Sequence, residues 1–83
     1  MSEQEILDRT YGYVAASYNG GEATFSADDG LLENGIIDSL GLLDLVAFLE
    51  RTFAIAIDDD DVDLDNFESV RTITRFVVGK LHQ

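Results

Sequence analysis

The stretch from Gly35 to Phe53, GIIDSLGLLDLVAFLERTF, constrains the fold of this 83-residue chain more than any other. Asp38 is placed to cap a helix over residues 39–53. Ser39 then follows the cap, so its hydroxyl should lie at the helix start and point outward. Projected at 3.6 residues per turn, the helix carries two apolar stripes rather than one. The first contains Leu42, Leu45, Val46, Leu49 and Phe53, and the second contains Leu40, Leu43 and Ala47, with Asp44 and Arg51 beside it.

A helix in a small bundle needs only one apolar stripe for the core, so the second stripe is available for another contact. The alternative is that Leu40 and Leu43 simply pack under the preceding loop. Gly41 falls in the first turn of the helix and should weaken it, because glycine is a poor helix former.

Residues 2–18 are predicted to form a first helix. Ser2 and Glu5 match the S-x-x-E capping box. The helix has an inward face with two tyrosines, Tyr11 and Tyr13, at its edges; that face contains Ile6, Leu7, Thr10, Val14 and Tyr18. Asn19-Gly20-Gly21 tolerates left-handed backbone and should end the helix.

No helical or strand period persists between residues 20 and 38, which predicts a long loop. A loop of this length needs anchors if it is to pack against a core. The sequence offers five apolar ones, Phe25, Leu31, Leu32, Ile36 and Ile37. We therefore expect a loop draped over the bundle, with a single helical turn at Leu31–Leu32.

The C-terminal part is predicted to contain a connector, a short helix and a last long helix. Residues 54–57 should be extended, with Ile55 or Ile57 reaching the core, and residues 58–61 should form a solvated acidic turn. Asp63 can cap a short helix over 64–68 with Phe67 inward, and Ser69 can cap a helix over 70–82. The inward face of that last helix should contain Val70, Ile73, Val77 and Leu81, with Phe76 on its flank.

These elements predict an all-α fold: a small bundle of three main helices plus one short helix, with a long loop between the first and second helices. Residues 1–83 are long enough for one domain with one small core. Without cysteine, the chain has no disulfide framework and no thiolate nucleophile. It lacks an apolar run of about 18 residues, so we expect no membrane span and a cytoplasmic monomer.

Charge is divided unevenly along the chain. Residues 1–68 hold all 17 acids and two arginines, a net charge of −15, whereas residues 69–83 hold three basic residues and no acid, which gives −12 in total. Such a surface should repel nucleic acids and attract partners with basic patches. Solubility alone is an alternative reason for the acidity.

Two candidate chemical sites, an EF-hand loop and a serine-hydrolase site, do not match their motifs. An EF-hand loop that starts at Asp59 would place Leu64 sixth and Val70 twelfth, where glycine and glutamate are needed. Residues 58–65 are therefore interpreted as a solvated turn rather than a metal site, with loose cation binding as the alternative. Ser39 lacks a G-x-S-x-G elbow, and the only histidine, His82, lies at the chain end. We therefore expect no enzyme activity from the chain alone.

The ordered motifs around Ser39 resemble those of the acyl carrier and peptidyl carrier protein family. D-S-L at 38–40 matches the family's attachment motif and precedes an apolar helix that ends in Phe53. I-x-I-x-D at 55–59 and F-x-S-V at 67–70 follow in the same order as in the family. The resemblance covers most of residues 25–81. The pattern L-x-x-x-G-I-I-D-S at 31–39 looks like that of discrete carriers that work beside an adenylating ligase.

The resemblance implies that Ser39 receives 4′-phosphopantetheine from coenzyme A through a separate phosphopantetheinyl transferase. Asp38 would cap the helix and orient Ser39. An acyl or aminoacyl group would then be carried as a thioester from an adenylating acyl or aminoacyl ligase to a downstream acyl-acceptor enzyme. The second stripe would be the docking patch, with Asp44 and Arg51 at its rim.

The helix departs from the strongly acidic recognition helix of fatty-acid carriers, because Asp44 and Glu50 are its only acids. This difference favours aminoacyl, aryl or specialised acyl cargo over fatty-acid synthesis. The alternative function is a cofactor-free acidic interaction module that uses the Leu40/Leu43/Ala47 patch.

Overall fold

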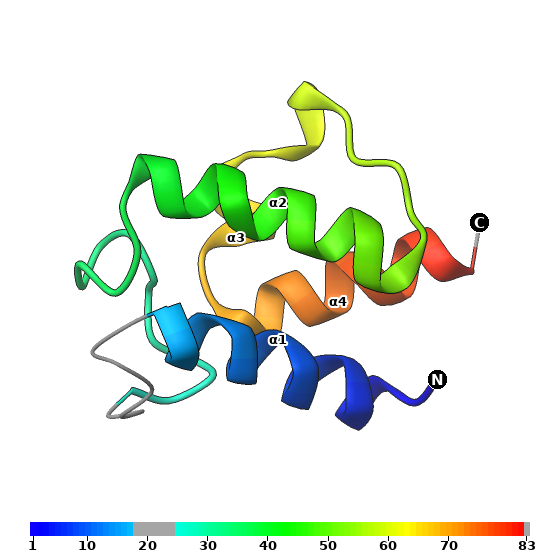
Figure 1. The fold of residues 1–83 in the computed structure, drawn as a ribbon, viewed down its shortest axis with the longest axis horizontal. Coiled ribbons are helices and arrows are strands. Elements are labelled where there is room, and N and C mark those ends of the chain that lie inside the picture. The colour runs from blue at the N-terminus through cyan, green and yellow to red at the C-terminus, as the bar shows by residue number, and fades with distance from the viewer. Residues whose placement is uncertain (18–24, 83) are drawn as a thin grey trace.

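The computed structural model describes residues 1–17 and 25–82, and in these ranges the chain is helical without strands (Figure 1). The elements are α1 (Glu3–Ser17), α2 (Ser39–Phe53), the 3₁₀ turn η2 (Asp59–Asp61), α3 (Leu64–Phe67) and α4 (Val70–Leu81). α4 packs on α1, α2 and α3. The predicted all-α bundle of three main helices and one short helix is therefore confirmed. Tyr18 and Asn19-Gly20-Gly21 lie outside the described residues.

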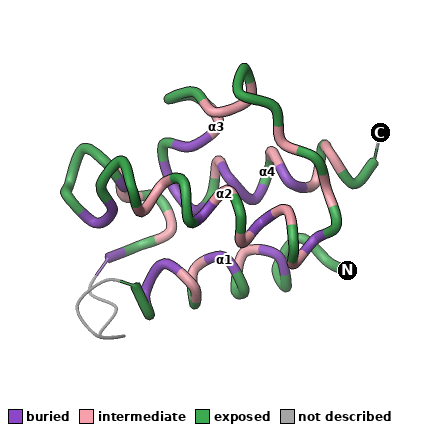
Figure 2. Tube along the Cα trace, turned by 45° about the horizontal axis from the view of Figure 1, so that its top comes forward, coloured by how far each residue is buried: buried purple, intermediate pink, exposed green. Residues whose placement is uncertain are grey.

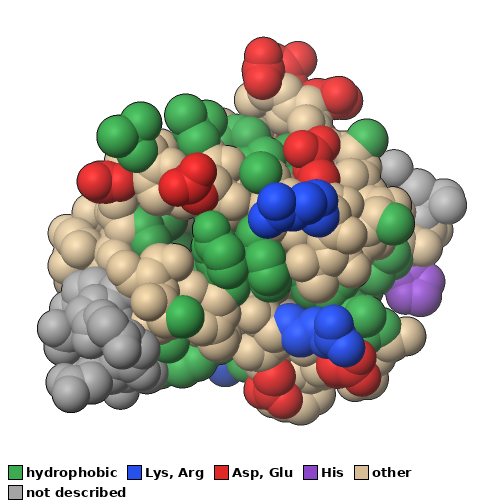
Figure 3. All heavy atoms as spheres, viewed as in Figure 1, with side chains coloured by type: hydrophobic (Ala, Val, Ile, Leu, Met, Phe, Trp, Pro, Cys, Tyr) green, Lys and Arg blue, Asp and Glu red, His purple; other side chains and the backbone are tan. Residues whose placement is uncertain are grey.

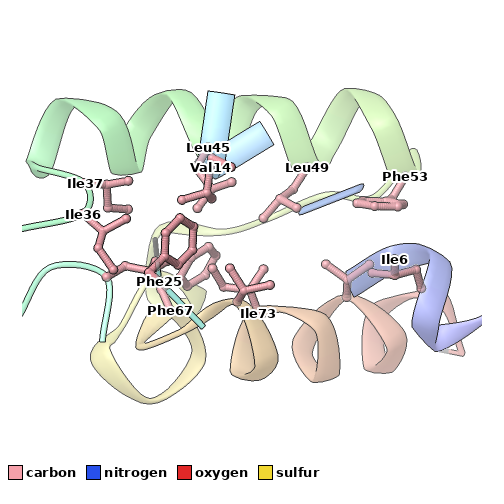
Figure 4. Close-up of a cluster of buried hydrophobic side chains, with 14 residues drawn as sticks. Ile6, Val14, Phe25, Ile36, Ile37, Leu45, Leu49, Phe53, Phe67 and Ile73 are labelled. Carbon is pink, nitrogen blue, oxygen red and sulfur yellow. The ribbon is translucent and has the colours of Figure 1, made fainter. Parts of the chain in front are cut away.

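The core is built from all the α-helices and from the segment that leads into α2 (Figure 2). Leu45, Leu49 and Phe53 of the first predicted stripe are buried, and Leu42 and Val46 are partly buried against them. Figure 4 shows the three buried side chains pointing from α2 into the space above α4. This stripe therefore fixes which side of α2 faces the bundle.

α1 begins and packs largely as the sequence predicts. The Ser2 hydroxyl accepts the Glu5 N–H at 3.2 Å. The inward face contributes Ile6, Thr10 and Val14 as buried residues and Leu7 as a partly buried one. The hydroxyl of Thr10 is buried without a hydrogen-bond partner among the described residues. Such a group lowers stability, because its desolvation is not compensated.

Both tyrosines of α1 lie at its edges, as predicted, and each stacks on a phenylalanine. The ring of Tyr11 lies 4.6 Å from that of Phe25, and its hydroxyl donates to the Phe25 carbonyl. The ring of Tyr13 lies 4.2 Å from that of Phe48 in α2. These aromatic pairs join α1 to the loop on one side and to α2 on the other.

The loop before α2 packs over the core through four of its five predicted anchors. Phe25, Leu31, Ile36 and Ile37 are buried, but Leu32 is 37% exposed, so its prediction as an anchor is wrong. Residues 30–35 form one hydrogen-bonded turn, in which the Asn34 N–H donates to the Gly30 carbonyl at 3.1 Å with the spacing of the predicted helical turn. In this turn Leu31 points inward and its neighbour points outward. The backbone N–H of Arg71 donates to the Ala27 carbonyl at 2.9 Å, which ties the loop to α4.

The connector after α2 differs in two details from the prediction. α2 ends at Phe53, and the capping residue Ala54 has a left-handed rather than an extended backbone, with φ 54°. Ile55 and Ile57 are both partly buried against the core, whereas the sequence predicted that one or the other would reach it. The predicted solvated turn forms η2, and its last residue, Asp61, pairs with Lys80 of α4 at 2.9 Å.

The short and last helices begin where their caps predict. The Asp63 carboxylate accepts the Asn66 N–H, and the Ser69 hydroxyl accepts the Thr72 N–H. Phe67, Val70, Ile73 and Val77 are buried. Leu81 is 41% exposed, so its inward assignment is wrong. It is the last residue of α4 and borders an open hollow at the end of the bundle instead of the core.

The ion pair between Lys80 and Asp61 makes a testable contribution to stability. The hydrogen bond from Lys80, followed by the Asp58 N–H, lowers the pKa of Asp61 below its ordinary 3.8, and desolvation partly opposes them. A lowered folded-state pKa adds stability that is complete above pH 3.8 and is lost as the pH falls through the folded-state value. The unfolding free-energy difference between wild type and Lys80→Met should therefore shrink below that pH.

Urea unfolding followed by circular dichroism at pH 7, 5 and 3 measures this difference. Arg75→Met is the control, because it removes an exposed cation from the same helix. An unchanged gap between wild type and Lys80→Met at pH 3 would contradict the proposed contribution.

Candidate functional site

The start of α2 has the cap that the sequence predicts. Asp38 has an extended backbone, with φ −106° and ψ −174°. Its carboxylate Oδ1 accepts the Gly41 N–H at 2.7 Å, and its carbonyl accepts the Leu42 N–H at 2.9 Å. Ser39 is therefore the first helical residue, and it is exposed.

Gly41 has a role in this cap that the sequence analysis missed. A Cβ atom at this position would lie 3.3 Å from Asp38 Oδ1 and 3.3 Å from Ile37 Cβ. Both distances are tighter than ordinary contacts, and Ile37 is buried. The absent side chain lets the carboxylate and the buried isoleucine close over the first turn. The sequence feature that could have indicated this role is the position of Gly41 three residues after the capping Asp38.

α2 presents four sides, and each has a different environment. Leu45, Leu49 and Phe53 face the core. Phe48 faces α1 through its stack on Tyr13. Glu50 faces the connector, because its carboxylate Oε2 accepts the Ile57 N–H at 3.0 Å. The fourth side faces solvent.

Ser39 lies on the connector side of α2. It precedes Glu50 by 11 residues, which is close to three full turns of helix. Residues at this spacing lie on nearly the same side of the helix. The serine is therefore beside the exposed stripe and away from the side that packs on α1.

The fourth side is the second stripe of the sequence analysis. Leu40 is 73% exposed and Leu43 is 63% exposed, and the other members, Asp44, Ala47 and Arg51, are exposed as well. The alternative in which the leucines pack under the loop is therefore wrong. Figure 3 shows hydrophobic and acidic side chains, and then a basic group, along the upper part of the face where α2 lies in Figure 1. We refer to these five residues as the α2 patch.

The structure also locates the residues of the two chemical sites considered in the sequence, the hydrolase pair of Ser39 with His82 and the acidic turn. His82 borders a hollow together with Phe53, at the opposite end of α2 from Ser39. A helix of this length separates the two ends by about 20 Å, so His82 cannot act as a base for Ser39. Within the described residues, no group of three or more His, Cys, Asp or Glu side chains is arranged to hold a metal ion. The acidic segment uses Asp61 for an ion pair and Asp63 for a cap.

Among the helices that the structure describes, none is both long enough and apolar enough to span a bilayer.

A small helical bundle with an exposed serine at the start of a capped helix has the architecture expected of a carrier domain. The family model described as "Phosphopantetheine attachment site" matches residues 20–77, which is more than half of the chain. The chain belongs to this family and is a carrier protein.

A solved structure described as "Structure of KstB-PCP(apo)", a peptidyl carrier protein, is similar to most of the chain. It is 38% identical, with a TM-score of 0.76, and the match covers 94% of this chain and 88% of that one. No curated protein matches the chain.

The site fits the covalent 4′-phosphopantetheine that this family carries. The attachment of this group needs an accessible alcohol, and Ser39 is exposed. The first turn of a helix also favours a phosphodiester, because its N–H groups and dipole give that end a partial positive charge. The Asp38 carboxylate accepts the Gly41 N–H and does not bond to the Ser39 hydroxyl, so a group attached to that hydroxyl need not displace the cap.

The cap predicts a measurable stability change. Asp38→Ala removes the acceptor of the Gly41 N–H and should lower the free energy of unfolding by about 1 kcal/mol. Asp38→Asn keeps an oxygen acceptor and should lose less. Urea unfolding measures the stability, and hydrogen exchange at the Gly41 amide shows whether the loss is local. Equal exchange in all three proteins would contradict the capping role.

Proposed function

We propose that Ser39 is the attachment residue, and that the chain holds an acyl or aminoacyl group as a thioester and delivers it between partner enzymes. The observation that carries this proposal is the exposed Ser39 at the capped start of α2, in a chain of the phosphopantetheine attachment family. Residues 1–83 would form a single carrier domain. When bound, the cofactor supplies the thiol that this cysteine-free chain lacks.

The chain's own residues would present the attachment point rather than catalyse a reaction. Ser39 supplies the alcohol, and Asp38 fixes the first turn on which it lies. A phosphopantetheinyl transferase would supply the base for the attachment step. An adenylating acyl or aminoacyl ligase would load the thiol, and a downstream acyl-acceptor enzyme would unload it.

The α2 patch supports brief docking of these enzymes. Leu40 and Leu43 offer a small apolar contact beside Ser39, and Asp44 adds charge at the rim. A small apolar contact with charged neighbours gives fast association and release, because charge raises the on-rate more than the affinity. Arg51 ends the patch with the opposite charge and would restrict which partners fit.

The charge of α2 favours aminoacyl, aryl or specialised acyl cargo over fatty-acid synthesis. The helix has two acids, and Glu50 is engaged with the Ile57 N–H on the connector side. Asp44 is then the only acid that α2 directs along the patch. A partner that requires a strongly acidic helix would find too few carboxylates here.

Cofactor loading separates this function from a cofactor-free interaction module. Incubation with coenzyme A, Mg²⁺ and a promiscuous phosphopantetheinyl transferase should add the mass of one phosphopantetheine group to the wild type. Ser39→Ala should gain nothing, whereas Ser17→Ala, which changes an exposed serine of α1, should load normally. Intact-mass spectrometry reads the result. An unmodified wild type, or a modified Ser39→Ala protein, would refute the assignment.

Docking through the α2 patch predicts a selective kinetic defect. Leu43→Asp should lower kcat/KM for loading by the same transferase about tenfold, because it loses an apolar contact at the interface. Its urea midpoint should stay near that of the wild type, since Leu43 is largely exposed. Leu81→Asp is the control, because Leu81 is exposed at the other end of the bundle. Equal losses in both variants would exclude a specific role for the patch.

A further inference from the structure

Side chains that readily attack a thioester are rare in this sequence. Thiolates, neutral amines and imidazoles are the protein groups that react most easily with such an acyl group. The chain has no cysteine, and Lys80 and His82 are its only lysine and histidine. The other four basic residues are arginines, whose guanidinium group stays protonated and has no lone pair to donate. Side-chain amine and imidazole chemistry is therefore confined to two residues.

Both of these residues lie at the end of the bundle opposite Ser39. His82 borders the hollow that includes Phe53, the last residue of α2. Lys80 lines a second hollow, which shares Ala54 with the first. Figure 1 shows that α2 ends on the side of the molecule where both chain ends lie and begins on the other side. The length of α2, about 20 Å, therefore separates its first residue from the hollows that contain the amine and the imidazole.

Lys80 is also engaged with neighbouring side chains. Its Nζ atom donates to Asp61 Oδ2 at 2.9 Å and lies 5.7 Å from the centre of the Phe76 ring. Only 17% of its side chain is exposed. An ammonium group has donor hydrogens and no lone pair, so the lysine in this ion pair cannot attack a carbonyl carbon. The contact that joins η2 to α4 thus also occupies the only lysine of the chain.

The α2 patch, by contrast, carries its positive charge on an arginine. Arg51 is exposed, and it forms no ion pair within the part of the chain that the structure describes. A lysine would offer a docking partner the same charge. Its amine, however, would lie on the same side of α2 as the surface beside Ser39. The guanidinium group supplies the charge without a nucleophile.

We infer that the carrier protects its cargo by keeping nucleophiles away from Ser39, and that Arg51 serves the α2 patch as a cation that cannot capture an acyl group. This inference rests on the proposed function at Ser39. The reaction that it excludes is transfer of the cargo to the chain itself. In that reaction an amine nitrogen attacks the thioester carbonyl carbon, the C–N bond forms and the C–S bond breaks. The amine loses a proton, and the sulfur leaves and is protonated to the free thiol.

The product of that transfer would be an amide, which is much less reactive than a thioester. The cargo would then be lost to the downstream enzyme. The inference therefore predicts that a lysine introduced into the α2 patch captures the cargo, whereas a lysine introduced elsewhere on the surface does not.

Two charge-conserving variants form the matched test. Arg51→Lys adds an amine to the α2 patch. Arg75→Lys adds one to α4, where Arg75 is exposed while Ile73 and Val77 of the same helix face the core. Both positions are exposed, so both variants should fold. Each protein is loaded from acetyl-coenzyme A with a promiscuous phosphopantetheinyl transferase and then incubated at pH 8 without the transferase.

Mass spectrometry after treatment with hydroxylamine reads the result, because hydroxylamine removes a thioester-bound acetyl group and leaves an amide-bound one. Arg51→Lys should form the acetyl amide at least about tenfold faster than Arg75→Lys, since the amine and the thioester share one surface. Ala47→Lys should react faster still, because residue 47 lies about 12 Å along the helix from Ser39 and residue 51 about 18 Å. Peptide mapping should place the amide at the introduced residue, and wild type should form none.

The amide is counted per loaded molecule, so slower loading of a patch variant does not change the result. Equal amide formation in Arg51→Lys and Arg75→Lys, or an acetyl amide at Lys80 in the wild type, would overturn the inference. The mass gain before incubation separates the two claims. A chain that never loads refutes the proposed function together with this inference, whereas a chain that loads but captures no acetyl group in either patch variant refutes this inference alone.

Discussion

The hydrogen bond from the Gly41 N–H to the Asp38 carboxylate sets the residue at which α2 begins, and the rest of the site depends on that start. If α2 began one residue earlier or later, Ser39 would no longer be its first residue. With the present start, Ser39 takes that position in solvent. The buried stripe of Leu45, Leu49 and Phe53 then fixes the rotation of the helix on the bundle. These two constraints together leave Leu40 and Leu43 outside the core.

The segment that precedes α2 also fixes the residue at which the helix begins. Ile36 and Ile37 are buried directly before the cap, so the chain enters the helix from a fixed point. The Arg71 N–H and side chain hold the loop at Ala27 and Asp28. In the proposed function, partner enzymes must reach Ser39 in one geometry, so the start of α2 must be held in place. The loop holds the start of α2 in place through these contacts.

Local sequence signals predicted the parts of the fold that depend on neighbouring residues. The caps at Asp38, Asp63 and Ser69 were predictable because each side chain bonds to a backbone N–H three residues ahead. The separation of two apolar stripes in α2 was also predictable, since it follows from helical spacing alone.

Burial at turns and chain ends was less predictable, because it depends on what packs there. Leu31 and Leu32 are adjacent and chemically identical, yet the turn buries one and exposes the other. Leu81 fits the helical period but lies past the core. The hydrogen bond from the Ile57 N–H to the Glu50 carboxylate joins the connector to α2 across seven residues, so no local pattern indicates it.

The central claim is that α2 turns one apolar stripe into the core and the other into solvent beside Ser39. Solvent paramagnetic relaxation, measured on leucine methyl groups with a soluble gadolinium chelate, tests it directly. Leu40 and Leu43 should show strong relaxation enhancement, and Leu45 and Leu49 should show almost none. Protection of all four leucines, or enhancement of all four, would contradict it.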